Sequence, residues 1–149
     1  MTGLFIIAHA PLASALRTVA MHAYPDAGAS IVVYDVPTGD DVDRYLVEAE
    51  RELAKLKPDS VLIMTDVPGA TPANLAGRLV RRGASRALAG VSLPMVWRAL
   101  NYRELPLDEL FARARDGALA CVLPVVAPAP QNQGRLANPD DSNKRHDNQ

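Results

Sequence analysis

Three short apolar runs stand out in the first half of the chain. Residues 3–8 (GLFIIA), 30–36 (SIVVYDV) and 60–65 (SVLIMT) are rich in aliphatic and β-branched side chains, and none of them alternates strictly between apolar and polar positions. Runs of this kind are typical of strands that are buried on both faces of a sheet. We therefore predict three buried strands, and two weaker ones at 87–93 (ALAGVSL) and 119–125 (LACVLPV).

Helical patterns fill the intervals between these runs. The clearest covers residues 40–56, where apolar side chains recur every three or four positions and the acidic pair Asp40 and Asp41 stands at the favourable amino-terminal end. Further helices are predicted at 11–23, 72–82, 94–102 and 107–116. Strands that alternate with helices form βαβ units, so the predicted fold class is α/β, an open three-layer αβα domain around a mostly parallel sheet.

The regular pattern ends near residue 126. Residues 127–149 are rich in Pro, Asn, Gln and charged side chains and offer almost nothing apolar to bury. Segments of this composition cannot compensate the entropy lost on folding. The sequence therefore predicts one domain at 1–126 and a disordered tail at 127–149.

The charge of the chain argues against some classes of partner. With 16 basic and 17 acidic side chains the formal net charge is −1, so there is no cationic footprint for nucleic acid or for an anionic membrane surface. The apolar runs are too short, or too rich in proline, to form a secretory leader or to insert into a bilayer. We expect a cytoplasmic protein.

The sequence contains few of the residues and motifs that bind metals or nucleotides. Cys121 lies in the apolar run 119–125 and is expected to be a small buried side chain. Without paired histidines and cysteines at ligand spacing we expect no metal, and without a G-x-x-x-x-G-K-[ST] or G-x-G-x-x-G motif we expect no nucleotide. No cofactor is predicted.

Proline stands at three of the predicted strand-to-helix junctions. Pro11, Pro72 and Pro94 each stand where a helical pattern begins. We expect each of them at the first helical position, where the missing N–H of proline is tolerated. Carboxyl ends of parallel strands share one edge of a sheet, and ligand chemistry gathers there. The polar side chains that we expect to converge at this edge are His9, Asp66, Thr71 and Ser92.

Three of these side chains have both a functional and a purely structural interpretation. His9 is either an exposed loop residue or a nucleophile beside a helix start, where free N–H groups and the helix dipole favour phosphate. Asp66 either caps its own turn or accepts a hydrogen bond from one ring nitrogen of His9, leaving the lone pair of the other nitrogen free. Thr71 is an N-cap, a phosphate ligand together with the N–H groups around Gly69 and Ala70, or both.

Three sequence blocks, HAP, TDVPGATPAN and AGVSLPM, resemble the IIA component of the mannose family of the bacterial phosphoenolpyruvate-dependent sugar phosphotransferase system, over about residues 1–126. The resemblance implies that His9 accepts a phosphoryl group on Nε2 from the phosphocarrier HPr and passes it to a IIB component. It also implies that Asp66 holds the ring at Nδ1 and that Thr71 contacts the phosphate. Many relatives have T-H-G around the histidine and D-x-x-G-G-S after the third strand, whereas Ala10 and Ala70 replace a glycine here.

The same resemblance implies the surroundings of the site. Family members exchange a fifth, antiparallel strand across a homodimer, which here would be 119–125, and the IIB partner would be a separate chain. No metal is needed, because the phosphoryl group moves between two nitrogens. Protein partners require a shallow, mostly apolar rim, for which we expect Pro11, Leu12, Val67, Pro68, Ser92 and Met95.

Three other functions remain open at this point. The phosphorylation state of His9 could be a signal read by a partner without sugar transport, or the protein could supply phosphoryl groups to dihydroxyacetone kinase. A hydrolase with Thr71, His9 and Asp66 as a triad is less favoured, because no G-x-S-x-G elbow is present.

Overall fold

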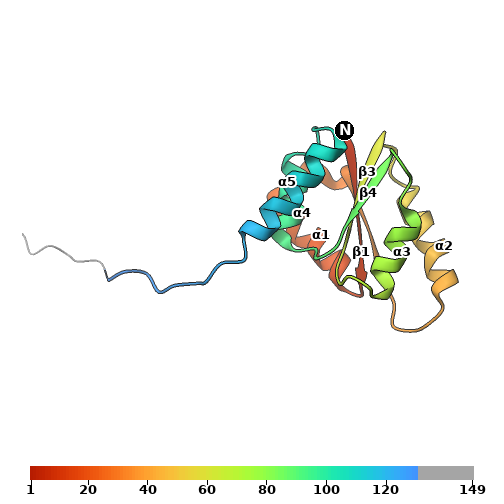
Figure 1. The fold of residues 1–149 in the computed structure, drawn as a ribbon, viewed down its shortest axis with the longest axis horizontal. Coiled ribbons are helices and arrows are strands. Elements are labelled where there is room, and N and C mark those ends of the chain that lie inside the picture. The colour runs from red at the N-terminus through yellow and green to blue at the C-terminus, as the bar shows by residue number, and fades with distance from the viewer. Residues whose placement is uncertain (131–149) are drawn as a thin grey trace, which may run out of the picture.

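Four parallel strands form a single sheet in the order β2–β1–β3–β4 (Figure 1). The computed structural model describes residues 1–130 of the chain. The strands are β1 (Thr2–His9), β2 (Ile31–Val36), β3 (Ser60–Thr65) and β4 (Ser85–Leu88). The three buried strands predicted from the apolar runs are therefore confirmed. The weaker strand predicted at 87–93 lies earlier, because the backbone leaves the sheet before Gly90, whose φ is +81°.

Helices cover both faces of the sheet (Figure 1). One layer contains α1 (Leu12–Ala23), α4 (Leu93–Asn101) and α5 (Leu107–Ala120), and the other contains α2 (Val42–Leu53) and α3 (Thr71–Leu79). A 3-10 turn, η1 (Pro25–Ser30), leads into β2. The predicted three-layer αβα architecture is confirmed. Within residues 1–130, no helix is both long and apolar enough to cross a membrane.

Strand β1, inside the sheet, contributes side chains to two hydrophobic clusters, one on each face of the sheet. Leu4, Ile6 and Ala8 belong to the cluster under α1, α4 and α5, whereas Phe5 and Ile7 belong to the cluster under α2 and α3, and all five are fully buried. Successive side chains of a strand point to opposite faces. His9, two positions beyond Ile7, therefore belongs to the α2 and α3 side of the sheet.

The three helices that follow the proline junctions start one residue away from the predicted positions, and the helix predicted from residue 40 starts at Val42. Pro11 is the N-cap of α1 and not its first residue, and the Ala10–Pro11 peptide bond is cis. Helices α3 and α4 begin one residue before Pro72 and Pro94. The first helical hydrogen bonds are already accepted by the carbonyls of Ala70 and Ser92. Thr71 is therefore the first residue of α3 and not its N-cap.

The C-terminal part of the described chain differs most from the prediction. Helix α5 continues to Ala120, so residues 119 and 120 are helical, and 122–130 form no strand. A strand needs a neighbouring strand for its backbone hydrogen bonds, and none of the four strands of this chain pairs with the segment predicted at 119–125. Cys121 is exposed, so its predicted burial is wrong. Residues 131–149 of the predicted tail lie outside the described residues.

Candidate functional site

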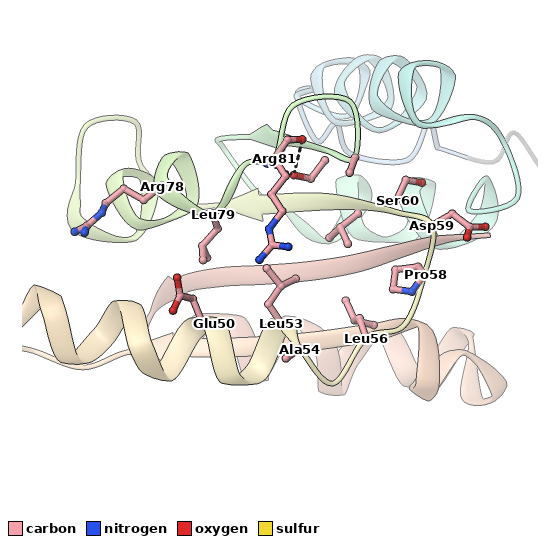
Figure 2. Close-up of a pocket in the computed structure, with 13 residues that line it drawn as sticks. Glu50, Leu53, Ala54, Leu56, Pro58, Asp59, Ser60, Arg78, Leu79 and Arg81 are labelled. Carbon is pink, nitrogen blue, oxygen red and sulfur yellow. Dashed lines mark hydrogen bonds between the residues drawn. The ribbon is translucent and has the colours of Figure 1, made fainter.

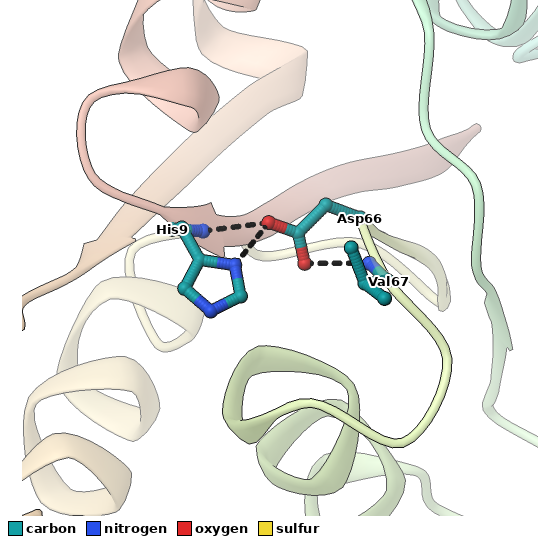
Figure 3. Close-up of polar contacts among 3 residues, drawn as sticks. All are labelled: His9, Asp66 and Val67. Atoms are coloured by element: carbon teal, nitrogen blue, oxygen red, sulfur yellow. Dashed lines mark hydrogen bonds and ion pairs between the residues drawn. The ribbon is translucent and has the colours of Figure 1, made fainter.

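His9 and Asp66 form one hydrogen-bonded unit at the carboxyl edge of the sheet (Figure 3). His9 ends β1 and Asp66 directly follows β3, and β1 and β3 are neighbours, so the fold brings two residues 57 positions apart side by side. Oδ2 of Asp66 lies 2.6 Å from Nδ1 of His9 and also accepts the backbone N–H of His9 at 2.9 Å. The carboxylate therefore fixes both the ring and the main chain of the histidine.

The environment keeps Asp66 ionised. Partial burial raises the pKa of the carboxyl, but hydrogen bonds from the His9 backbone, the His9 ring and the Val67 backbone together hold that pKa below its ordinary value. An ionised carboxylate only accepts hydrogen bonds, so in the neutral imidazole Nδ1 of His9 carries the proton and Nε2 carries the lone pair. The His9 side chain is 54% exposed and that of Asp66 only 9%. The ring is accessible from solvent, while the group that orients it is covered.

A tight turn follows Asp66. The N–H of Ala70 donates to the carbonyl of Val67 at 3.2 Å, with Pro68 and then Gly69, whose φ is +81°, at the two central positions. Proline followed by a residue with positive φ is the pattern of a type II turn, so the Pro-Gly pair predicts this geometry locally. The N–H of Ala70 is thereby committed to the turn, which corrects the expectation that it faces a phosphate.

The loop after β4 supports the backbone of Asp66. The N–H of Gly90 donates to the carbonyl of Asp66 at 2.7 Å, and the N–H of Val91 donates to the carbonyl of Thr65 at 2.9 Å. The loop after β4 is therefore hydrogen-bonded to the main chain at the end of β3 and at Asp66. Sequence reasoning missed this contact, for which the only local signal is a glycine two residues before Ser92.

The other predicted polar residues meet the histidine less directly. Thr71 is half-buried at the start of α3, in the helical layer that His9 faces, and no hydrogen bond within residues 1–130 joins it to His9 or Asp66. The Thr-His contact of a hydrolase triad is thus missing from the described hydrogen bonds. Ser92 is the N-cap of α4, and its Oγ accepts the N–H of Met95 at 3.3 Å.

The predicted apolar rim is found in part. Pro11, Leu12, Val67 and Pro68 are exposed around the histidine, with exposed fractions of 38% for Leu12 and 55% for Val67. Met95 is only 3% exposed, so its assignment to the surface is wrong. The reason is that α4 turns the face that carries Met95, Val96 and Ala99 toward the core.

A cavity lies at the other end of the strands from His9. Its volume is about 500 Å³, and it opens between α2 and α3 at the amino-terminal end of β3 (Figure 2). Ser60 begins β3 in its wall, whereas His9 lies at the opposite edge of the sheet, where β1 ends. The His9 side chain is 54% exposed and is not among the residues that line this cavity. Within residues 1–130 no group of three or more His, Cys, Asp or Glu could hold a metal ion.

The sequence model of the EIIA-man family, described as the PTS system fructose IIA component, matches residues 3–114, which include His9, Asp66 and Thr71. The chain belongs to this family. It is therefore a phosphocarrier IIA component of the phosphotransferase system. No protein of curated function matches the sequence.

Solved structures share the fold of this IIA protein. A mannose/sorbose specific IIA subunit from Enterococcus faecalis is 19% identical, with a TM-score of 0.77 over 86% of this chain and 97% of that one. An EIIA component from Streptococcus agalactiae is also 19% identical, with a TM-score of 0.73 over 83% and 97%. A sigma-54 interaction domain protein from Enterococcus faecalis, 15% identical, has a TM-score of 0.59 over 80% and 91%. At these identities the likeness concerns the fold.

Proposed function

We propose that His9 is the phosphoryl acceptor of this IIA protein and that Asp66 orients it. The observation that carries the proposal is the 2.6 Å contact between Nδ1 of His9 and an ionised Asp66, which leaves Nε2 as the free, exposed nucleophile. The donor is the phosphohistidine of the carrier protein HPr, and the acceptor is a IIB component. Both partners are cytoplasmic proteins, and we propose the same location for this chain.

The transfer is a single exchange of P–N bonds. The lone pair on Nε2 of His9 attacks phosphorus, the bond between phosphorus and the donor imidazole breaks, and its electron pair returns to the donor nitrogen. The proton on Nδ1 stays between His9 and Asp66, where the carboxylate stabilises the positive charge that develops on the ring. Positioning of the ring supplies most of the acceleration. The same steps in reverse direction pass the group to IIB.

The start of α3 is the proposed binding place for the phosphoryl oxygens. His9 faces the layer that contains α3, and the amino-terminal end of that helix carries partial positive charge. Thr71 offers a hydroxyl there, and the turn offers the N–H of Gly69, because the N–H of Ala70 already bonds to Val67. The contribution of Ala70 is limited to shaping the turn.

The exposed apolar rim is the proposed docking surface for HPr and IIB. It consists of Pro11, Leu12, Val67 and Pro68, and Ser92 contributes by capping α4 beside it. Interfaces of transient partners combine such an apolar centre with a polar margin. A shallow surface of this kind lets a donor and then an acceptor reach the same Nε2 atom in turn.

Phosphorylation by phosphoenolpyruvate, enzyme I and HPr tests the proposal. We expect the wild type to acquire an acid-labile, base-stable phosphate, and the His9→Ala variant to acquire none. His22→Ala is the matched control, since His22 is an exposed histidine in the last turn of α1 and should leave labelling unchanged. Equal labelling of His9→Ala and wild type would overturn the assignment.

A regulatory use of the same chemistry is the second candidate. It is favoured by one observation: the fold also occurs in a protein described as a sigma-54 interaction domain protein. In that case phosphorylation of His9 would control binding to a partner, and no IIB protein would accept the group. Supply of phosphoryl groups to dihydroxyacetone kinase is a variant of the transfer function. Incubation of the phosphorylated protein with a mannose-type IIB protein distinguishes these uses, because only a transport component loses its phosphate.

We also propose a homodimer in which the part of the predicted strand 119–125 that follows α5 pairs with a second copy. Apolar side chains of this segment are almost fully exposed in the single chain, among them Val122 at 84% and Val125 at 101%. The edge strand β4 of a second copy offers unpaired backbone groups that such a segment would satisfy.

A further inference from the structure

An acidic residue of β2 holds the start of α1. Asp35 lies near the carboxyl end of β2, in register with Ala8, the residue before His9. One of its carboxylate oxygens accepts the backbone N–H of Ser14 at 3.1 Å, and the other accepts the Ser14 hydroxyl. Ser14 is the third residue of α1. Asp35 therefore performs the task of an N-cap from a different element of the fold.

Helix α1 depends on this contact because it has no N-cap side chain of its own. Its N-cap residue is Pro11, which makes no side-chain hydrogen bond to the first turn. The first N–H groups of a helix lack partners within the helix, and a negative charge is favourable at that end. A carboxylate supplied by β2 meets both needs.

The connection between His9 and α1 is short enough for this contact to matter at the histidine. Only Ala10 and Pro11 separate β1 from α1. At the start of this link the N–H of Ala10 donates to the carbonyl of Val36 at 3.0 Å, and beyond its end the N–H of Ser14 donates to Asp35. Two consecutive residues of β2 thus hold both ends of the link, while Asp66 holds the N–H of His9 from the β3 side.

We propose that Asp35 is a positioning residue for His9, acting through Ser14 on the main chain that carries the imidazole. It has a second effect, since its carboxylate occupies an N–H group at the amino-terminal end of α1. A phosphoryl group on His9 is then not drawn toward α1 and stays on the side of α3. The inference rests on the proposed role of His9.

The test compares the carboxylates that cap two helices. Asp41 is the N-cap of α2 and accepts the N–H of Arg44 at 3.2 Å, so Asp41→Ala removes a cap of the same kind without touching the β1–α1 link. Asp35→Ala is expected to lower the rate of His9 phosphorylation at saturating phospho-HPr about tenfold, with little change in KM, because a small displacement of the nucleophile slows transfer. Asp41→Ala is expected to lower the melting temperature similarly and to keep the wild-type rate.

Two further variants grade the effect. Asp35→Asn keeps an oxygen that can accept the N–H of Ser14, so its rate should lie between those of wild type and Asp35→Ala, and it serves if Asp35→Ala does not fold. Ser14→Ala removes only the hydroxyl and should also give an intermediate rate. Wild-type rates in Asp35→Ala and Asp35→Asn, or equal slowing by Asp41→Ala, would overturn the proposal.

A readout independent of phosphorylation separates this inference from the proposed function. Hydrogen exchange of the Ala10 amide, which is bonded to Val36, should accelerate in Asp35→Ala and stay at the wild-type rate in Asp41→Ala. Unchanged exchange in Asp35→Ala would contradict a positioning role. Failure of wild-type His9 to accept phosphate would instead refute the proposed function, while the exchange measurement would still decide whether Asp35 holds the link.

Discussion

At the residue scale, the protonation of one imidazole determines which atom can react. Asp66 accepts from Nδ1 of His9, from the backbone N–H of His9 and from the backbone N–H of Val67 at 2.7 Å. These three donors satisfy the carboxylate and lower its pKa, so it remains an acceptor at neutral pH. The reactivity of Nε2 is therefore a consequence of hydrogen bonds made at the opposite side of the ring.

Asp66→Asn should impair transfer without unfolding the protein. An amide can donate to Nδ1 and so favour the tautomer with the proton on Nε2, which removes the nucleophile. We expect phosphorylation to slow roughly 100-fold, the scale of a misplaced reacting group. The measurement is the initial rate of labelling together with circular dichroism. Asp59→Asn, at the opposite edge of the sheet, is the control, and full activity in Asp66→Asn would remove the carboxylate from the mechanism.

The same contact makes a pH-dependent contribution to stability. The pKa of Asp66 in the folded protein lies below its ordinary value of 3.8. The ionised carboxylate therefore contributes its full stabilisation above about pH 4, and this stabilisation is lost as the pH falls through the pKa of the folded state. The difference in free energy of unfolding between wild type and Asp66→Asn should therefore shrink below about pH 4. Urea titrations between pH 3 and pH 7 measure it, and a difference that grows toward acid would contradict the assigned ionisation.

At the element scale, loop geometry determines where helices begin and how rigidly they are held. Gly39, in the loop before α2, has a φ of +140°, and a Cβ built there would lie 2.6 Å from the hydroxyl of the buried Tyr45. Gly77 lies inside α3, and a Cβ there would meet no atom within 4 Å. The two glycines have opposite roles, since only the first is required by its surroundings.

Alanine at these two positions should change stability in opposite directions. Gly39→Ala is expected to lower the free energy of unfolding by about 2 kcal/mol, because alanine must adopt a strained φ and displace Tyr45. Gly77→Ala is expected to raise it by up to about 1 kcal/mol through helix propensity. Urea unfolding of both variants measures this, and a stable Gly39→Ala would show that the loop rearranges easily.

At the scale of the whole molecule, the apolar side chains from the last turn of α5 to residue 126 are exposed, and no contact within the single chain explains them. Leu119, Val122, Leu123, Val125 and Val126 are each at least 68% exposed. Contiguous apolar exposure of this kind marks an interaction site or an aggregation hazard. Pairing with the β4 edge of a second copy would cover both the segment and the open edge.

Substitutions that introduce charged side chains into this segment should therefore dissociate the proposed homodimer. We expect the wild type to sediment as a dimer and the double variant Leu123→Lys, Val125→Lys as a monomer, because burial of two ammonium groups in an apolar interface is unfavourable. Val47→Lys, an exposed position on α2 in the opposite layer, should leave the dimer intact. A monomeric wild type at micromolar concentration in sedimentation velocity would refute the exchange.

The local parts of the fold could be predicted from the sequence because they depend on neighbouring residues. Apolar runs gave β1, β2 and β3, helical spacing gave the helices, and Pro68-Gly69 carries the turn after Asp66. The exact helix boundaries do not follow from the pattern, since the first residue of a helix depends on which carbonyl accepts the first hydrogen bond. The N-cap interpretation of Thr71 is wrong for this reason, and the surface assignment of Met95 is wrong because the rotation of α4 is a property of packing.

The sequence by itself determined the strands, most of the helices and the polar residues that end up at one edge of the sheet. Only the tertiary structure decided how these residues pair. The strand order β2–β1–β3–β4 sets Asp66 on one side of His9 and Asp35 on the other, because β1 lies between β3 and β2. Nothing local distinguishes Asp35 from a solvated carboxylate. Its partner lies 21 residues away, and contacts between distant segments depend on packing that no local pattern encodes.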